Sequence, residues 1–94
     1  MKLISNKALR DFAAVHADAG QPLQEFRRAM EKGGFANFAQ LKGAFSTVDK
    51  VGDKCVFNIG GNKYRLVAWL HFEARRCYIK AVLTHGEYDK GKWK

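Results

Sequence analysis

The chain has 94 residues, enough for one small domain and too few for a nucleotide-binding domain with a separate substrate domain. Hydrophobic residues make up 47% of the chain, aromatic residues 13%, and only one residue is proline, which favours a folded protein over a disordered one. Seventeen Lys and Arg residues against nine Asp and Glu residues give a net charge of +8. This charge indicates a polyanionic or acidic partner, with nucleic acid as the first candidate.

The segment Met1–Lys7 lacks the apolar stretch of a secretory signal. The longest apolar run, Leu66–Leu70, is far shorter than the roughly 20 residues that a membrane-spanning helix needs. Cys55 and Cys77 form no Cys-x-x-Cys motif, and a reducing compartment would keep both as thiols. We therefore expect a cytoplasmic protein with no membrane partner and with both cysteines in its core.

The first half of the chain has the spacing of helices. The short Lys2–Ile4 segment is compatible with an edge strand. A helix is predicted over residues 6–18, where the residues of one face recur three and four apart: Leu9, Phe12, Ala13 and His16. A second helix carries Pro22 in its first turn and ends at Gly33–Gly34. A third, short helix begins at the N-cap residue Asn37, and we expect all three helices to be structural.

From Cys55 onward the pattern changes to strands. Segments rich in Val, Ile, Phe, Tyr and Trp cover residues 55–59, 63–72 and 77–85. The turn Gly60–Asn62 joins the first two, and Ala74–Arg75 is predicted as a two-residue loop between the last two. The expected fold is therefore α+β, a single domain over residues 1–94 with its helices on one face of an antiparallel sheet that ends in a three-stranded meander.

The two faces of this predicted meander differ in chemistry. With a two-residue loop, odd positions of the middle strand share a face with even positions of the last strand. The apolar face, expected to pack on the helices, comprises Cys55, Phe57, Ile59, Tyr64, Leu66, Ala68, Leu70, Phe72, Cys77, Ile79, Ala81 and Leu83. The opposite face, termed the outer face, comprises Lys63, Arg65, Val67, Trp69, His71, Tyr78, Lys80, Val82 and Thr84.

The outer face alternates cations with aromatic and small apolar side chains. Cations can hold phosphates while aromatic rings offer stacking surfaces to unpaired bases. The same composition also fits an ordinary solvated surface, where Lys and Arg are common. A register shift of one residue would bury Lys63 and Arg65 at a high cost in free energy, which supports the assignment of these residues to the outer face. It does not decide between an RNA-binding face and an ordinary solvated surface.

Three segments resemble a known protein family. The strings VFNIGGNKYRL (56–66), CYIKAVLTHGEYDKGKW (77–93) and NFAQLK (37–42) are similar to HigB-type toxins of bacterial type II toxin–antitoxin systems, relatives of the RelE mRNA interferases. The first two motifs are the more specific, and the similarity covers nearly the whole chain in order. It implies a RelE-like fold and mRNA cleavage, usually on the translating ribosome, without cofactor or metal. It also implies neutralisation by a HigA-like helix-turn-helix antitoxin.

The resemblance also implies catalytic residues. Such toxins resemble metal-free ribonucleases, in which the RNA 2′-hydroxyl attacks the adjacent phosphate, a base removes its proton, cations stabilise the added charge and an acid protonates the leaving 5′-oxygen. Arg65 matches the family's GGN-x-x-R motif and is the candidate phosphate clamp. Lys80 could add positive charge or act as the base. His85 and Tyr88 lie in a segment similar to the family's THxEYD motif and are candidates for proton transfer or base stacking.

The positions around this catalytic set leave alternatives open. Strict strand alternation points His85 toward the helices. A position in the core therefore remains an alternative to a catalytic role for this residue. Glu87 and Asp89 are expected to orient other groups. The candidate RNA-binding residues are Lys63, Trp69, His71, Tyr78, Lys90 and Lys92. A noncatalytic RNA- or ribosome-binding module and an inactive toxin relative that co-regulates its antitoxin are the alternative functions.

Other motifs are excluded by spacing. Gly60–Lys63 lacks the Walker pattern of a nucleotide-binding loop. The separations of Cys55, His71, Cys77 and His85 match no common zinc finger, so no metal site is predicted. A thiol on an apolar strand face stays protonated, which argues against Cys77 as a nucleophile.

Overall fold

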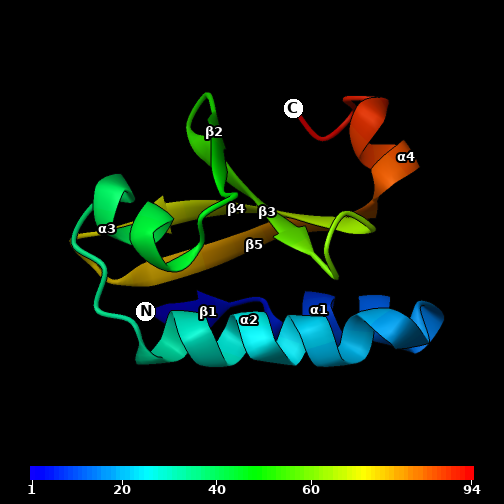
Figure 1. Cartoon of the computed structure of the whole chain (residues 1–94), viewed down its shortest axis with the longest axis horizontal. Helices are drawn as coiled ribbons and strands as arrows, with labels where there is room; N and C mark the ends of the chain where they lie inside the picture. The colour runs from blue at the N-terminus through cyan, green and yellow to red at the C-terminus, as the bar shows by residue number, and fades with distance from the viewer.

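In a computed structural model that describes residues 1–94, helices α1 and α2 lie along one face of a five-stranded sheet, and α4 with the C-terminus lies on the other side (Figure 1). The strand order is β1-β5-β4-β3-β2. The elements are β1 (Lys2–Ile4), α1 (Asn6–Val15), the 3₁₀ turn η1 (Ala17–Ala19), α2 (Gly20–Lys32), α3 (Phe38–Ala44), β2 (Asp49–Val51), β3 (Lys54–Ile59), β4 (Tyr64–His71), β5 (Arg76–Thr84) and α4 (His85–Asp89). None of the helices combines the length and apolar character needed to cross a bilayer.

The predicted α+β architecture is confirmed, with one additional strand and with one parallel pairing in a sheet that was predicted to be antiparallel. β3, β4 and β5 form the expected antiparallel meander, and β1 is an edge strand that pairs with β5 in parallel. β2 was not predicted; it extends the meander by pairing with β3. β2 has three residues, and its Asp49 and Lys50 are both polar and exposed. Its sequence therefore lacks the alternation of hydrophobic and polar residues from which a strand is predicted.

The three predicted helices are present, one of them with a different boundary, and the structure adds α4, which was not predicted. α1 ends at Val15 rather than at residue 18, because the chain continues as the 3₁₀ turn η1. α2 carries Pro22 in its first turn and ends at Lys32, as expected. Asn37 caps α3 through a hydrogen bond that its side-chain oxygen accepts from the Gln40 N–H at 2.9 Å.

The hydrophobic core lies between the helices and the apolar face of the sheet. The side chains of Leu9 and Leu23 from the helices and of Phe57 and Leu66 from the strands are almost fully buried there. Both cysteines are buried in this core, as predicted. Burial raises the pKa of the Cys77 thiol to about 12, which keeps it protonated and unreactive.

The loop between β4 and β5 has four residues, not the predicted two. His71 pairs with Arg76, and the loop closes with a hydrogen bond from the Arg75 N–H to the Phe72 carbonyl at 3.2 Å. Arg75 has a φ of 56°, which gives the left-handed turn that this longer loop uses. The register therefore shifts by two residues, which leaves Trp69 and Tyr78 on the same face, as predicted.

A β-bulge at Lys80 makes the other main correction. Val67 pairs with Ala81 and Ala68 pairs with Ile79, so Lys80 is an extra residue without a partner in β4. An extra residue exchanges the two faces of the strand beyond it. The prediction for this half of β5 was therefore wrong: Val82 and Thr84 turn to the helix side, and Ala81 and Leu83 turn to the outer face.

Candidate functional site

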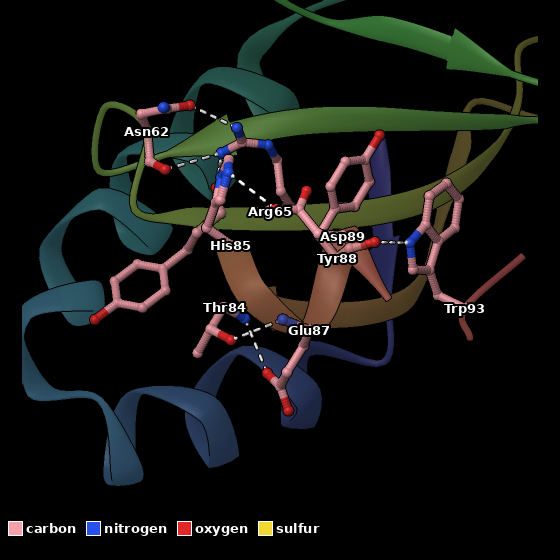
Figure 2. Close-up of polar contacts among 9 residues, drawn as sticks. Asn62, Arg65, Thr84, His85, Glu87, Tyr88, Asp89 and Trp93 are labelled. Carbon is pink, nitrogen blue, oxygen red and sulfur yellow. Dashed lines mark hydrogen bonds and ion pairs between the residues drawn. The ribbon is translucent and has the colours of Figure 1, made fainter. Parts of the chain in front are cut away.

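The bulge also decides where His85 lies. Leu83 pairs with Arg65, so the chain leaves β5 for α4 on the outer side, and the His85 N–H donates a hydrogen bond to the Lys63 carbonyl at 3.1 Å. The expectation from strict alternation, that His85 points toward the core, was wrong. Its side chain is 48% exposed, and Figure 2 shows it on the same side of the sheet as Arg65.

α4 is held at the end of β5 by a capping box. The Thr84 hydroxyl accepts a hydrogen bond from the Glu87 N–H at 3.2 Å, and Glu87 Oε1 accepts one from the Thr84 N–H at 2.9 Å (Figure 2). This backbone hydrogen bond from Thr84 is the main reason why the pKa of Glu87 is lowered. The cap ends the strand at Thr84, one residue earlier than predicted. One turn later, Asp89 Oδ2 lies 3.3 Å from Nε2 of His85.

The Arg65 side chain is fixed by three acceptors. Its Nη1 donates to the carbonyls of Asn62 at 3.2 Å and Tyr64 at 3.1 Å, and its Nη2 donates to Asn62 Oδ1 at 2.5 Å (Figure 2). Asn62 thus contacts the Nη1–Nη2 edge of the guanidinium group. The Nε–Nη2 edge has no acceptor within the protein, and such an edge can contact two oxygens of one phosphate.

An aromatic stack covers Arg65 from the C-terminal side. Arg65 Cζ lies 5.6 Å from the centre of the Tyr88 ring, and Trp93 stacks on Tyr88 with ring centres 4.9 Å apart and planes 12° apart. Trp93 Nε1 also donates a hydrogen bond to the Tyr88 carbonyl at 2.9 Å. Figure 2 shows Tyr88 between Arg65 and Trp93. Arg65 was expected to be exposed but is only 8% exposed, because this stack covers it on the outer face.

Several predicted RNA-binding residues come together farther along the outer face. The Trp69 ring packs 5.2 Å from that of Tyr78 and 5.9 Å from that of His71, between ring centres. Lys80 is exposed at the bulge and lines a pocket together with Trp69 and Trp93. The exposed Lys90 and Lys92 line a second pocket, whose floor is formed by the outward-turned Ala81 and Leu83.

Lys63 does not join these residues. Its ammonium group forms an ion pair at 3.0 Å with Asp18 of η1, on the helix side, so its assignment to the outer face was wrong. The Tyr64 hydroxyl donates to the same carboxylate at 2.5 Å. This bond, with help from Lys63, lowers the pKa of Asp18, and it raises the pKa of Tyr64. The pair ties the start of β4, beside Arg65, to the helical layer.

Two residues of this arrangement were missed in the sequence. Asn62 was interpreted as part of a turn and of the family's GGN-x-x-R motif, without a role of its own, although it precedes Arg65 by three residues, a separation at which one turn of chain can bring both side chains together. Trp93 had no assigned role. It stacks on Tyr88 and closes the outer side of the candidate site, and the only sign of it in the sequence was an aromatic residue among the lysines of the tail.

Known proteins match the chain over most of its length. A family model described as "HigB_toxin, RelE-like toxic component of a toxin-antitoxin system" matches residues 19–91. The mRNA interferase toxin HigB of Escherichia coli strain K12 is 42% identical over 92 residues, which cover 95% of this chain and 88% of that protein. An mRNA interferase HigB of Escherichia coli O6:H1 is 28% identical over 93 residues, covering 96% and 90%. The chain therefore belongs to the HigB family of RelE-like toxins of toxin–antitoxin systems.

Proposed function

We propose that this protein is an mRNA interferase, an endoribonuclease that cleaves mRNA by attack of a 2′-hydroxyl group on the adjacent phosphate. Membership of the HigB family and the similarity to proteins named mRNA interferases support this function. The observation that carries it is the Arg65 guanidinium group, held by Asn62 and Tyr88 with its Nε–Nη2 edge left without a protein acceptor.

In this mechanism Arg65 contacts the two non-bridging oxygens of the scissile phosphate. Its charge persists at every physiological pH, and its planar fork matches the phosphate geometry. Because the hydrogen bonds to Asn62 and Tyr64 already fix its orientation, little reorganisation is needed when negative charge develops on phosphorus. The exposed Lys80 adds positive charge on the same face.

His85 is the proposed proton-transfer group. Imidazole can both accept and donate a proton near neutral pH, and the carboxylate of Asp89, 3.3 Å from Nε2, orients the ring. Tyr88 acts on Arg65 by stacking against the guanidinium group. The chain's own side chains thus supply the cation and the proton carrier that cleavage requires.

We further propose that cleavage occurs on the translating ribosome in the cytoplasm, and that a HigA-like helix-turn-helix antitoxin neutralises the toxin. The net charge of +8 supports contacts with RNA phosphates, because each neutralised phosphate releases counterions and increases affinity at low salt. Candidate phosphate contacts are Lys90 and Lys92, which are exposed beside the site.

Cleavage of a defined mRNA in a cell-free translation system tests this function. Wild-type protein should produce discrete 5′ ends, and Arg65→Ala should lose them in a protein that stays folded at the assay temperature by circular dichroism, although the loss of three hydrogen bonds lowers its unfolding temperature. Arg28→Ala is the matched control, because Arg28 is an exposed arginine on α2 in the helical layer. An unchanged rate for Arg65→Ala would reject the mechanism. Binding of mRNA without discrete ends would instead favour a noncatalytic RNA-binding module.

A further inference from the structure

The outer face holds a pocket of which the proposed cleavage chemistry uses only Lys80, as a source of positive charge. It has a volume of about 480 Å³, within the range of small-ligand sites, roughly 300 to 1,000 Å³. It is lined by Asp53, Lys54, Trp69, Lys80 and Trp93. We call it the tryptophan pocket.

Its walls combine two indole rings with two ammonium groups. The chain contains two tryptophans, and both line this pocket: Trp69 from β4 and Trp93 from the C-terminal tail. Each ring is partly exposed, so each keeps surface for a ligand. Flat aromatic walls favour planar ligands, and unpaired nucleobases stack on them with little dependence on base identity.

The charges at the pocket favour an anionic ligand. Lys80 forms none of the protein's ion pairs, and as the extra residue of the bulge it is exposed. Lys54 lies 3.3 Å from Asp53, a surface pair that contributes little to stability and can exchange with a phosphate. The pocket therefore offers one unpaired ammonium group next to the stacking surfaces.

Trp93 connects this pocket to the proposed cleavage site. Its ring stacks on Tyr88, which in turn stacks on the Arg65 guanidinium group. Tyr88 lies between these two partners (Figure 2), so a base that approaches this side of the site meets Trp93 instead of Tyr88. A nucleotide in the tryptophan pocket is then separated from Arg65 by two stacked rings, close enough to belong to the same RNA strand.

We propose that the tryptophan pocket binds a nucleobase of single-stranded RNA, stacked against Trp69 and Trp93, with an adjacent phosphate on Lys80. The inference rests on the proposed function, because it takes RNA as the ligand. It adds a base-binding subsite beside the scissile phosphate. RNA binding there depends on stacking as well as on charge.

A hexanucleotide made of 2′-O-methyl RNA tests the subsite, because it lacks the 2′-hydroxyl nucleophile and separates binding from cleavage. Both tryptophans line the pocket, so the intrinsic fluorescence of the wild-type protein reports binding without a label. Replacing one base by an abasic nucleotide should weaken binding about tenfold at the position that occupies the pocket. Trp93→Ala should weaken binding of the intact hexamer by a similar factor. This variant should bind the abasic hexamer as tightly as it binds the intact one.

Two further variants and one control keep the test decisive if Trp93→Ala loosens the tail. Trp93→Phe keeps a stacking ring and should retain most of the discrimination against the abasic hexamer. Lys80→Ala should reduce the slope of log affinity against log salt concentration by about the amount that one phosphate contact contributes. Lys32→Ala is the control, because it removes an exposed charge at the end of α2. It should bind like the wild type apart from a weak general charge effect.

The outcomes separate this inference from the proposed function. Trp93→Ala and the abasic nucleotide each reduce the affinity by some factor. If the two factors multiply when both changes are combined, the indole and the base do not contact each other, and the subsite is overturned. The absence of any fluorescence change with the intact hexamer would overturn it too. Neither result affects Arg65-dependent cleavage. Conversely, coupled losses in a protein that cleaves no mRNA would keep the subsite and reject the interferase.

Discussion

Asn62→Ala tests whether the orientation of Arg65, and not only its charge, matters for cleavage. Asn62 contributes two of the three acceptors of the guanidinium group, its carbonyl at 3.2 Å and its side-chain oxygen at 2.5 Å. The substitution removes only the second. A hydrogen bond to a charged group contributes about 1.5 to 3 kcal/mol, and the lower end applies because Asn62 is exposed. About 1.4 kcal/mol of lost orientation corresponds to a tenfold lower rate.

We therefore expect kcat/KM for a defined mRNA to fall about tenfold in Asn62→Ala, in a protein that stays folded but unfolds at a temperature several degrees lower. Asn62→Asp keeps an acceptor but places a carboxylate against the guanidinium group. This variant should keep Arg65 in place and weaken RNA binding, most strongly at low salt. Gln24→Ala is the control, because it removes an exposed amide from α2. Full activity of a folded Asn62→Ala protein would refute the view that Asn62 positions Arg65.

Three further changes test the surroundings of the site. Tyr64→Phe should lower the unfolding temperature at pH 7. The hydrogen bond from Tyr64 lowers the pKa of folded Asp18, so the charge-dependent part of this stabilisation is fully present above pH about 4 and is lost as the pH falls through the lowered pKa. The difference in unfolding temperature should therefore shrink in strong acid, and a constant difference would contradict the pairing. Thr84→Val should destabilise α4 by about 1 kcal/mol and reduce cleavage, while Thr84→Ser keeps both; equal activity of the two variants would argue against the cap. Burial raises the pKa of Cys77 to about 12, so this thiol should resist iodoacetamide at pH 8 until the protein unfolds. Mass spectrometry measures the labelling, and rapid labelling of the folded chain would contradict the burial of Cys77.

The parts of the fold that could be predicted from the sequence are those with a long, regular pattern. The spacing of Leu9 and Phe12 predicted α1, and the alternation from Tyr64 to Leu70 predicted the face of β4 that packs on the helices. The capping box of Thr84 and Glu87 was also visible as a Thr-x-x-Glu pattern, and it would have predicted α4. It was interpreted only as part of the family motif.

The bulge could not be predicted in the same way. Ala81, Val82 and Leu83 are three apolar residues in a row, so either face of β5 could be the buried one beyond Lys80. Only the pairing with β4 decides which residues turn outward. Trp93 reaches Tyr88 by local contacts instead: the chain turns at Gly91, which has a φ of 70°, and Trp93 Nε1 donates to the Tyr88 carbonyl, but a turn of this kind gives the lysine-rich tail no regular hydrophobic pattern.

The bulge links the two sites of the outer face to one irregularity of β5. Without the extra residue, continued alternation would turn Leu83 toward the helices and His85 with it, so that the Arg65 guanidinium group would lie on the face opposite the imidazole. The same residue, Lys80, has no partner in β4 and is exposed beside Trp69. The core tolerates the exchange of faces because Val82 takes the place on the helix side that Ala81 and Leu83 leave. A local loss of sheet regularity thus brings a histidine and a free lysine to the charged face while the hydrophobic core remains filled.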